Sequence, residues 1–366
     1  MFSGRKIFPF TSSSQSGAGP EVAQLRKKLR RNRNRLNRKD EELVRLRREL
    51  VQAQTSVPRD SVPKFFLVGQ AKSGTSWLMR LLHSHPEILC HGEGKLFGKD
   101  SHKTLHGAFA RSELFQSWLT RNPWTWREND PKLEDILAAC VDYLMAEKLA
   151  KNGRAKIVGD KTPLTSTEIV NEIAALLPDS KVIHIIRDGR DVAISRMHHL
   201  WNRATGEGGK YELTPEERSK RDRYREDPEA FLRCGESIFT EERLRETAAD
   251  WTEKVGATYR DGPALLGDRY AEVRYEGLLQ RPVEIARELM AFLDVNSSEE
   301  VAAGCVEAVS FERLSKRTSG EEDPTSFYRK GVSGEWEGVF TGEDRQTFKQ
   351  VAGDLLIELG YAKDAD

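Results

Sequence analysis

The chain has 366 residues, of which 38% are hydrophobic and 32% are charged, and its formal net charge at pH 7 is zero. These values are typical of a soluble protein with one large α/β domain and appendages, or with two modest domains. Four scattered cysteines without a CxxC pair disfavour a zinc site or a disulfide scaffold, and neither a signal peptide nor a membrane span is apparent, so we expect a cytoplasmic protein.

The first part of the chain differs in composition from the rest. Residues 1–20 are rich in Ser and Gly and are predicted to be disordered. Residues 21–55 form a basic segment, and residues 1–55 together carry 14 Lys/Arg against 5 Asp/Glu. Residues 56–63 contain two prolines and are predicted to be a linker. We therefore expect the globular domain to cover residues 64–366.

A heptad pattern runs through the basic segment without an interrupting Pro or Gly. The a positions are Val22, Leu29, Leu36, Leu43 and Leu50, and the d positions are Leu25, Asn32, Lys39, Leu46 and Ala53. We expect a coiled-coil arm over residues 21–53 that forms a homo-oligomer and has affinity for anionic surfaces. A single solvated helix is the alternative, because the basic residues at its centre repel one another. Nucleic acid is a disfavoured partner, because the arm has no aromatic residues for stacking.

In the globular part, short apolar runs alternate with segments of helical periodicity. Strands are predicted at 64–69, 88–91, 155–159, 181–186 and 270–274. Helices are predicted at 75–84, 132–150, 166–177, from 189 on, and at 238–260, 282–293, 298–308 and 342–358. This alternation predicts an α/β fold with a mostly parallel central sheet flanked by helices.

The segment Phe65–Leu78 has the pattern of a strand, a turn and a helix. Its turn contains Gly69, a lysine at Lys72 and a run of small residues, which allow backbone N–H groups to surround a phosphate. The run does not fit the template G-x-x-x-x-G-K-[ST] of ATP- and GTP-binding loops, because Gly74 is followed by Thr75. A phosphate-binding turn of another class is therefore expected.

Two further segments carry groups that suit a nucleotide. Arg187 leaves a predicted strand, and Ser195 lies eight residues on, so both could reach one phosphate at the carboxyl edge of the sheet. The segment Phe327–Trp336 reads FYRKGVSGEW and joins aromatic residues to adjacent cations and two glycines. Aromatic rings stack on a base, while cations and a glycine N–H hold a phosphate.

The three segments resemble the motifs of the sulfotransferases that use 3′-phosphoadenosine-5′-phosphosulfate (PAPS). The resemblance spans about Lys64 to Tyr361, with Ala71 in place of a common proline, and implies the P-loop NTPase-like sulfotransferase fold. It implies that PAPS is the co-substrate, that adenosine 3′,5′-bisphosphate (PAP) is the product, and that no metal takes part. By position, the 5′-phosphosulfate would be held by Lys72, Ser73, Gly74, Thr75 and Ser76. The 3′-phosphate would be held by Arg187, Ser195, Arg329, Lys330 and Gly331, with Trp77 and Phe327 flanking the adenine.

The catalytic base is where the chain departs from the soluble small-molecule members of that family. They usually carry Lys-Thr-His after the third strand, whereas this chain has Lys161 and Thr162 followed by Pro163. The members that act on glycans use a glutamate just after the second strand, and Glu93 fits that location. We therefore interpret Glu93 as the base, or else as a loop carboxylate paired with Lys95. His85 and His91 are the other candidates for the base.

Lys161 is the third catalytic candidate, after Lys72 and Glu93. It is expected to contact the transferring sulfuryl group, or else to be a surface lysine beside Asp160. The acceptor is expected to be a hydroxyl of a carbohydrate, glycolipid or glycosylated metabolite, bound near residues 95–130 and 205–230. These two regions and their surroundings contain the aromatic residues Trp118, Trp124, Trp126, Trp201 and Tyr211, which are core residues in the alternative interpretation. A P-loop kinase-like phosphotransferase and a non-enzymatic coiled-coil adaptor are the competing functions.

Overall fold

The computed structural model describes residues 62–121, 133–204, 211–318 and 330–363, together with Lys28, Lys39 and Glu42. The predictions for the disordered N-terminus, the coiled-coil arm and most of the linker therefore fall outside the described residues. So do four aromatic or basic residues of the predicted sites, namely Trp124, Trp126, Phe327 and Arg329. The α/β body accounts for nearly all of the described residues.

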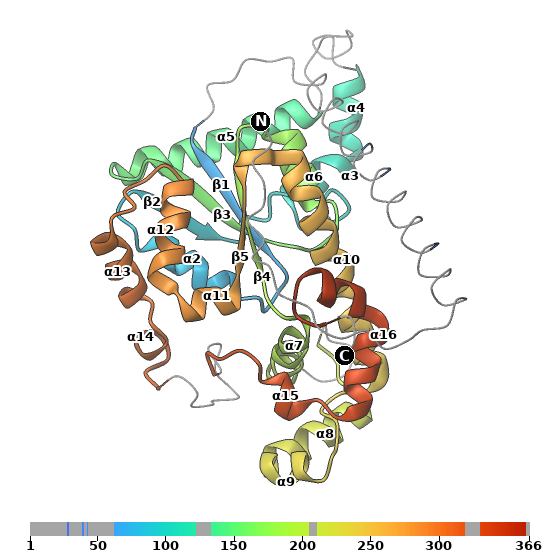
Figure 1. Cartoon of the computed structure of the whole chain (residues 1–366). Coiled ribbons are helices and arrows are strands. Elements are labelled where there is room, and N and C mark those ends of the chain that lie inside the picture. Colours follow the sequence, from blue (N-terminus) through green and yellow to red (C-terminus); the bar gives the residue numbers. More distant parts are fainter. Residues whose placement is uncertain are drawn as a thin grey trace. The chain divides into compact units, whose positions relative to one another are not determined.

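The body is built on five parallel strands in the order β2-β3-β1-β4-β5 (Figure 1). The strands are β1 (Lys64–Gly69), β2 (Ile88–Gly92), β3 (Ile157–Pro163), β4 (Lys181–Ile186) and β5 (Tyr270–Arg274). The central strand β1 is buried along its whole length, because it pairs with β3 on one side and β4 on the other. The chain leaves β1 toward β2 and β3 and later crosses to β4. That reversal creates a crevice at the carboxyl ends of the central strands, where open α/β sheets bind ligands.

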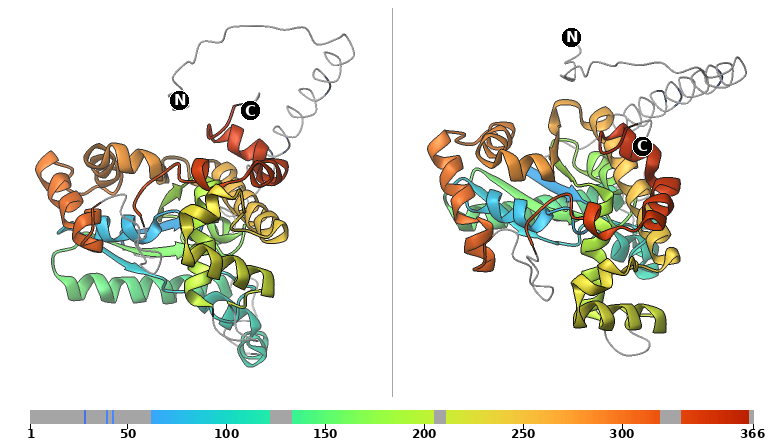
Figure 2. Two further views of the ribbon diagram at one scale, coloured as in Figure 1. Left: turned by 90° about the horizontal axis from the view of Figure 1, so that it is seen from below. Right: turned by 60° about the horizontal axis from the view of Figure 1, so that its bottom comes forward.

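Helices cover both faces of the sheet. One face packs against α2 (Thr75–His83), α11 (Tyr275–Gln280), α12 (Pro282–Phe292) and α13 (Glu299–Ala308) in one apolar cluster. The other face packs against α5 (Leu133–Asn152), α6 (Ile169–Leu176) and α10 (Glu241–Leu266). Figure 2 shows α5 and the pair α12–α13 on opposite sides of the strands. Side chains of β1 alternate accordingly, since Phe65 and Leu67 join the first cluster while Phe66 contacts Phe97 on the other side.

A second apolar cluster surrounds Trp251 of α10. It is formed by α7 (Gly189–Arg203), α8 (Pro215–Glu226), α9 (Pro228–Arg233) and α16 (Gly342–Glu358). A Cβ atom at Gly189 would lie 2.6 Å from the Trp251 ring, so only glycine lets the start of α7 approach the ring this closely. The Trp251 indole also donates to the carbonyl of Arg187 at 3.2 Å. The cluster therefore fixes the turn that follows β4.

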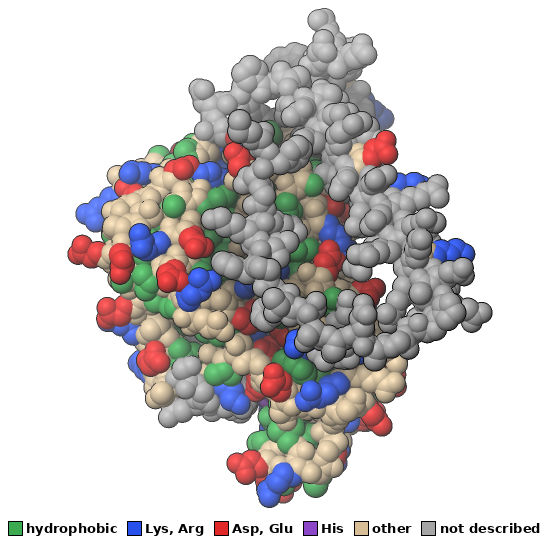
Figure 3. Space-filling model, in the orientation of Figure 1, with side chains coloured by type: hydrophobic (Ala, Val, Ile, Leu, Met, Phe, Trp, Pro, Cys, Tyr) green, Lys and Arg blue, Asp and Glu red, His purple; other side chains and the backbone are tan. Residues whose placement is uncertain are grey.

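The remaining helices are short and lie at the ends of the strands or in the connections between the longer helices. They are α3 (Leu105–Arg111), α4 (Glu113–Arg121), α14 (Phe311–Ser315) and α15 (Trp336–Val339), with a 3₁₀ turn at Gly267–Arg269. On the face in Figure 3, cationic and anionic side chains are interspersed over α12 and α13. Ion pairs there, such as Arg281–Glu284, are exposed, so each contributes at most about 1 kcal/mol and the core dominates stability. In the described part of the chain, none of the helices is both long enough and apolar enough to span a bilayer.

The sequence-based fold prediction is confirmed, with differences in three regions. Strand β3 extends to Pro163, whereas the sequence predicted its end at residue 159. The prediction stopped at the first polar residues, but Asp160 and Lys161 are buried because β3 pairs with strands on both sides. The described part of the polar region 205–230 is largely helical, in α8 and the start of α9, and it packs onto the second cluster through Leu213 and Tyr224. Helix α10 also continues past Pro263 to Leu266, six residues beyond its predicted end.

Candidate active site

A cavity of about 400 Å³ lies at the carboxyl edge of the sheet, where the loops after the central strands meet. Its walls come from the turn after β1, the start of α2, the ends of β2 and β3, helix α7 and the segment after Lys330. Its lining includes Lys72, Gly74, Thr75, Ser76, Trp77, Glu93, Lys161, Pro163, Arg187, Ser195, His199, Arg203, Tyr211, Tyr275, Phe311, Lys330, Gly331, Val332 and Glu335. The cavity therefore joins all three segments that the sequence singled out.

The turn between β1 and α2 has an unusual backbone. Lys72 has a φ of 78° and Gly74 a φ of 90°, while the N–H of Ser73 bonds to the carbonyl of Gln70 at 3.0 Å. A non-glycine residue in the left-handed region is strained by roughly 1–2 kcal/mol, and such strain persists only when the surroundings hold it. The first N–H groups of α2, at Thr75 and Ser76, have no acceptor within the helix. This turn therefore presents backbone donors and a lysine to the cavity.

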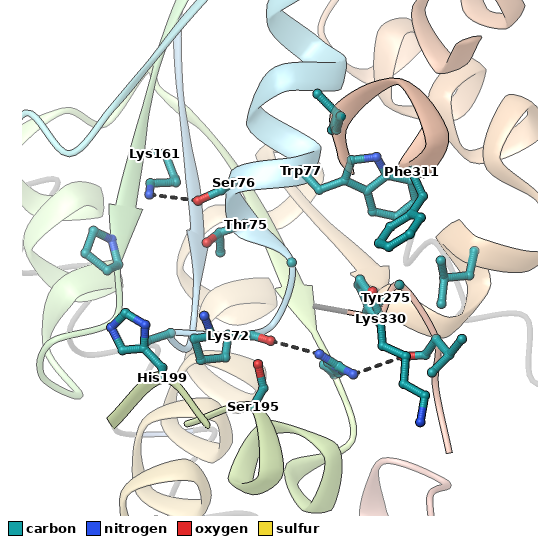
Figure 4. A pocket seen from close by; sticks show the side chains of 18 of the residues that line it. Lys72, Thr75, Ser76, Trp77, Lys161, Ser195, His199, Tyr275, Phe311 and Lys330 are labelled. Carbon is teal, nitrogen blue, oxygen red and sulfur yellow. Dashed lines mark hydrogen bonds between the residues drawn. The ribbon is translucent and has the colours of Figure 1, made fainter. Parts of the chain in front are cut away.

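Glu93 and Lys161 form an ion pair in the wall beside that turn. The Lys161 Nζ lies 2.8 Å from Glu93 Oε1. It also lies 3.2 Å from Ser76 Oγ, and Figure 4 shows this second bond. The Glu93 N–H also bonds to the Lys161 carbonyl at 2.9 Å, which continues the pairing of β2 with β3. The Lys161 side chain is 10% exposed and that of Glu93 is 52% exposed. The pair therefore joins a fixed cation to a carboxylate that solvent and ligands can reach.

Asp160 holds the loop that carries Glu93. Its Oδ1 accepts the Gly94 N–H at 2.8 Å and its Oδ2 accepts the Thr162 hydroxyl at 2.7 Å. Burial raises the pKa of the Asp160 carboxyl, although these two hydrogen bonds and Lys161 act in the opposite direction. Glu93 itself has a φ of 55°, so its conformation depends on these tertiary contacts.

Arg187 connects the two loops at the opposite wall. Its guanidinium donates to the Lys72 carbonyl at 3.2 Å and to the Val332 carbonyl at 3.1 Å, and it lies 4.5 Å from the centre of the Tyr275 ring. Figure 4 shows both hydrogen bonds, with Ser195 below Lys72 on helix α7. One cation thus bridges the turn at Lys72 and the segment that begins at Lys330.

Asp191 fixes the same segment from behind the cavity. This carboxylate is completely buried, accepts the Gly334 N–H at 2.7 Å and the Trp336 N–H at 3.1 Å, and lies 3.7 Å from Arg187 Nη2. Burial raises the pKa of Asp191, while Arg187 and the two backbone N–H groups act to lower it. Arg190, one residue earlier, stacks on the Trp336 ring with 3.5 Å between guanidinium and ring centre. The loop is therefore held through its backbone and through its tryptophan.

The remaining end of the cavity is aromatic. Trp77 and Tyr275 meet edge to face at 6.0 Å, and the Trp77 indole donates to the Val309 carbonyl at 2.9 Å. Phe311 packs so closely on Gly331 that a Cβ atom there would lie 2.5 Å from the ring. Gly331 also has a φ of 68°, so glycine is required at this position. The arrangement suits a flat apolar group such as a nucleobase.

The donor set fits a nucleotide with phosphate groups at two places. Nine buried side-chain N or O atoms of the described residues have no hydrogen-bond partner, and two of them, Ser73 Oγ and Arg187 Nε, belong to predicted phosphate-binding segments. A buried donor without a partner costs about 1–3 kcal/mol, and an oxyanion bound in the cavity would remove that cost for Arg187, which lines it. Within the described ranges, no group of three or more His, Cys, Asp or Glu side chains is placed to hold a metal ion.

The structure brings most of the predicted site residues together. All those within the described residues line the cavity, except Ser73, which is buried in the turn behind it. Glu93 pairs with Lys161, and Lys161 is a buried strand residue, which excludes a surface position for it. His85 is buried against the Asn296 carbonyl at 2.9 Å, and neither it nor His91 is among the residues that line the cavity.

The aromatic residues predicted for the acceptor region behave differently from one another. Tyr211 lines the cavity. Trp201 is 3% exposed and packs against His198 and Tyr224, so it belongs to the core. Trp118 is stacked on Phe115 and is not among the lining residues. Of the three described aromatic residues, only Tyr211 therefore remains a candidate for contact with the acceptor.

Sequence reasoning missed several lining residues, among them His199, Arg203 and Phe311. His199 and Arg203 follow Ser195 at intervals of four, a helical spacing that would have placed all three on one face of α7. Phe311 reaches Gly331 only through tertiary packing, and nothing in its local sequence indicates that contact.

Comparison with known proteins identifies the family of the chain. A family model described as the sulfotransferase family matches residues 63–299. The chain belongs to the sulfotransferase family. Among curated proteins, it is 23% identical to protein-tyrosine sulfotransferase 2 of Gallus gallus over 351 residues, covering 94% of this chain and 81% of that protein. It is 27% identical to nodulation protein NoeE of Sinorhizobium fredii over 313 residues, covering 81% and 65% of the two chains. It is 24% identical to a flavonol sulfotransferase-like protein of Flaveria bidentis, covering 73% and 87%.

Solved sulfotransferase structures align with the body of this family member at low identity. Mouse sulfotransferase SULT7A1 complexed with PAP aligns over 83% of this chain and 90% of its own, with 17% identity and a TM-score of 0.47. The sulfotransferase domain of the Synechococcus PCC 7002 olefin synthase aligns over 82% and 98%, with 17% identity and a TM-score of 0.44.

Proposed function

We propose that this sulfotransferase transfers a sulfuryl group from PAPS to an acceptor hydroxyl. The observation that carries the proposal is the convergence of the Glu93–Lys161–Ser76 group with the Lys72 turn on one side of a single cavity. The bridging Arg187, Ser195, Lys330 and Gly331 line the same cavity beside its aromatic end. Such a site has separate places for two phosphate groups, a base and a transferring group.

PAPS, when bound, supplies an activated sulfuryl group on a phosphate leaving group. Trp77 and Phe311 offer aromatic faces to its adenine, with Phe327 expected to join them. Arg187, Ser195, Lys330 and Gly331 supply donors for the 3′-phosphate, and Arg329 is expected to join them. The Lys72–Ser76 turn supplies backbone N–H groups and one ammonium for the 5′-phosphosulfate.

In the proposed reaction, the acceptor oxygen bonds to sulfur while the bond from sulfur to the bridging phosphate oxygen breaks. Glu93 takes the acceptor proton as general base, and PAP leaves with the electrons of the broken bond. Lys72 stabilises the negative charge that develops on the leaving phosphate, as cations do in phosphoryl transfer. Lys161, which contacts both Glu93 and Ser76, orients the carboxylate and neutralises charge on the sulfuryl oxygens.

Glu93 compensates for the absence of histidine at position 163. Pro163 lines the cavity and has no ionisable group, so it cannot accept a proton. Glu93 directly follows β2, the strand that pairs with β3 on the side away from β1, and its side chain is about half-exposed. A base supplied from β2 therefore replaces one supplied from β3.

A hydroxyl of a carbohydrate, glycolipid or glycosylated metabolite is the proposed acceptor, supported by the polar wall that contains His199 and Tyr211. A tyrosine hydroxyl of a protein is the second candidate. It is favoured by the match to protein-tyrosine sulfotransferase 2, which covers 94% of this chain. Both acceptors use the same base and the same nucleotide site.

The test combines nucleotide binding with transfer. We expect PAP to raise the melting temperature of the full chain without magnesium, and labelled PAPS to yield a sulfated product from a panel of sugars, glycolipids and tyrosine peptides. Stabilisation by Mg-ATP but not by PAP would instead indicate a kinase-like phosphotransferase. PAP binding without turnover on any acceptor would indicate a nucleotide-binding adaptor.

A further inference from the structure

One face of helix α7 runs along the cavity from its phosphate-binding wall outward. Ser195, His199 and Arg203 are spaced four residues apart, and all three line the cavity. Residues at this spacing lie on one side of a helix. At roughly 1.5 Å per residue, Arg203 lies about 12 Å along the helix axis from Ser195. The face therefore extends well beyond the proposed position of the 3′-phosphate.

This outer part of the face lies away from the aromatic end. In Figure 4, His199 lies on the side of Lys72, whereas Trp77 and Phe311 lie at the opposite side of the cavity. The His199 ring meets Tyr211 edge to face, with 6.0 Å between centres and 89° between planes. The two rings form a wall of the cavity away from its aromatic end.

Arg203 differs from the other cations of the cavity. Lys161 is paired with Glu93, Lys330 with Glu335, and Arg187 with the buried Asp191. Arg203 is exposed and forms neither a hydrogen bond nor an ion pair with any other residue in the described ranges. The proposed nucleotide contacts also leave it unused, because they involve Lys72, Arg187 and Lys330.

We propose that Arg203, with the ring wall of His199 and Tyr211, forms a subsite for an oxyanion on the acceptor. The acceptor would then carry a carboxylate or a phosphate or sulfate ester in addition to its reactive hydroxyl. A guanidinium binds such groups through two parallel N–H donors, which favours arginine over lysine. This inference rests on the proposed function and identifies a class of acceptor within it.

The experiment uses two matched pairs of acceptors with the full chain and labelled PAPS. One pair is tyrosol and 4-hydroxyphenylacetate, and the other is methyl glucoside and methyl glucuronide. We expect the wild-type chain to favour the charged member of at least one pair by about tenfold in kcat/KM. In Arg203→Gln, that preference falls about tenfold through the KM of the charged acceptor, while the melting-temperature shift caused by PAP is retained. Arg203→Lys restores part of the preference.

Arg154→Gln is the matched control, because Arg154 is an exposed arginine in the bend after α5 and does not line the cavity. It should leave the preference unchanged. A role of Arg203 in stabilising the carboxyl end of its helix would instead lower the melting temperature and leave the preference intact.

Calorimetric titration of the PAP complex with each acceptor gives a second measurement that needs no turnover. Tighter binding of a charged acceptor that Arg203→Gln abolishes supports the subsite. Equal binding of charged and neutral members, or no binding of either, overturns it. Failure of PAP to bind the chain would instead refute the proposed function itself.

Discussion

Replacement of Asp191 by Asn tests whether the loop after Lys330 forms part of the nucleotide site. Asp191 is buried and accepts the backbone N–H groups of Gly334 and Trp336 at 2.7 and 3.1 Å. Asn has the same size but offers only one acceptor oxygen. Its NH₂ group would therefore either face one of the two backbone N–H groups or force the side chain to rotate away. One charge-assisted bond is lost, and the ion pair with Arg187 is lost with it.

The expected cost to nucleotide binding is about 1.5–3 kcal/mol, the usual contribution of a hydrogen bond to a charged group. That range weakens PAP binding by about tenfold to a hundredfold. Global stability should change by less than about 1 kcal/mol, because burial raises the pKa of Asp191 and a neutral side chain avoids that desolvation cost. Calorimetric titration with PAP measures the first quantity, and urea denaturation measures the second.

Asp344→Asn is the matched control for this prediction. Asp344 is also buried and also accepts two hydrogen bonds, from the Thr341 N–H at 2.9 Å and the Ser237 hydroxyl at 2.7 Å, but it does not line the cavity. We expect the Asp344→Asn protein to be less stable than the wild type and to bind PAP with unchanged affinity. Unchanged PAP affinity in Asp191→Asn would show that the Asp191 contacts do not position this loop for the nucleotide.

The site and the core support four further predictions. Lys72→Ala should abolish transfer with a modest loss of stability, and unchanged turnover of labelled PAPS would remove its assigned role. Glu93→Gln should lower kcat far more than PAP affinity, and wild-type kcat would place the base elsewhere. Burial, with Arg274, lowers the pKa of His184 to about 3, so stability should fall by about 1.4 kcal/mol per pH unit from pH 6.5 toward 3. Urea denaturation at several pH values should show a flatter profile for His184→Phe, and identical profiles would contradict this. Deletion of residues 1–55 should reduce the number of subunits per particle, measured by light scattering, and should spare transfer. An unchanged number of subunits would exclude the coiled coil.

The sign of the His184 prediction is set by the two pKa values. The unfolded chain binds a proton near pH 6.5, whereas the buried imidazole of the folded chain does so only near pH 3. Between these values the unfolded state holds more protons, so acid favours unfolding. The imidazole Nδ1 bonds to the Tyr270 hydroxyl at 2.7 Å, which keeps the ring in place within the sheet.

The parts of the fold that the sequence predicts correctly are those with local signals. Strand β1 is an apolar run that ends at a glycine, and the structure places it at Lys64–Gly69, as predicted. Gly69 must be glycine, because a Cβ atom there would lie 2.8 Å from Ile185 and Thr75. The phosphate turn, the Arg187 turn and the Lys330 loop are each visible as short motifs, and the parallel strand order brings them together.

The parts that the sequence does not predict depend on contacts between distant segments. Asp191 is one residue of a local motif, yet its partners lie more than 140 positions away in the chain. The burial of Lys161 results from the pairing of β3 with both neighbours, which a single strand pattern does not specify. Tyr275 directly follows β5, and its ring lies against the guanidinium of Arg187. This contact joins two distant segments, so only the packed structure reveals it.

The same distant contacts hold Glu93, the proposed base, in a strained turn. Its backbone pairs with Lys161, its loop is held by Asp160, and its carboxylate stays half-exposed beside the Lys161 ammonium. The strain of a left-handed glutamate is therefore offset by three contacts, all to residues of β3. Because β3 also pairs with β1, which leads directly into the Lys72 turn, the proposed base and the proposed phosphate-binding turn are attached to one strand pair. This arrangement gives the positional precision that group transfer between two bound substrates requires.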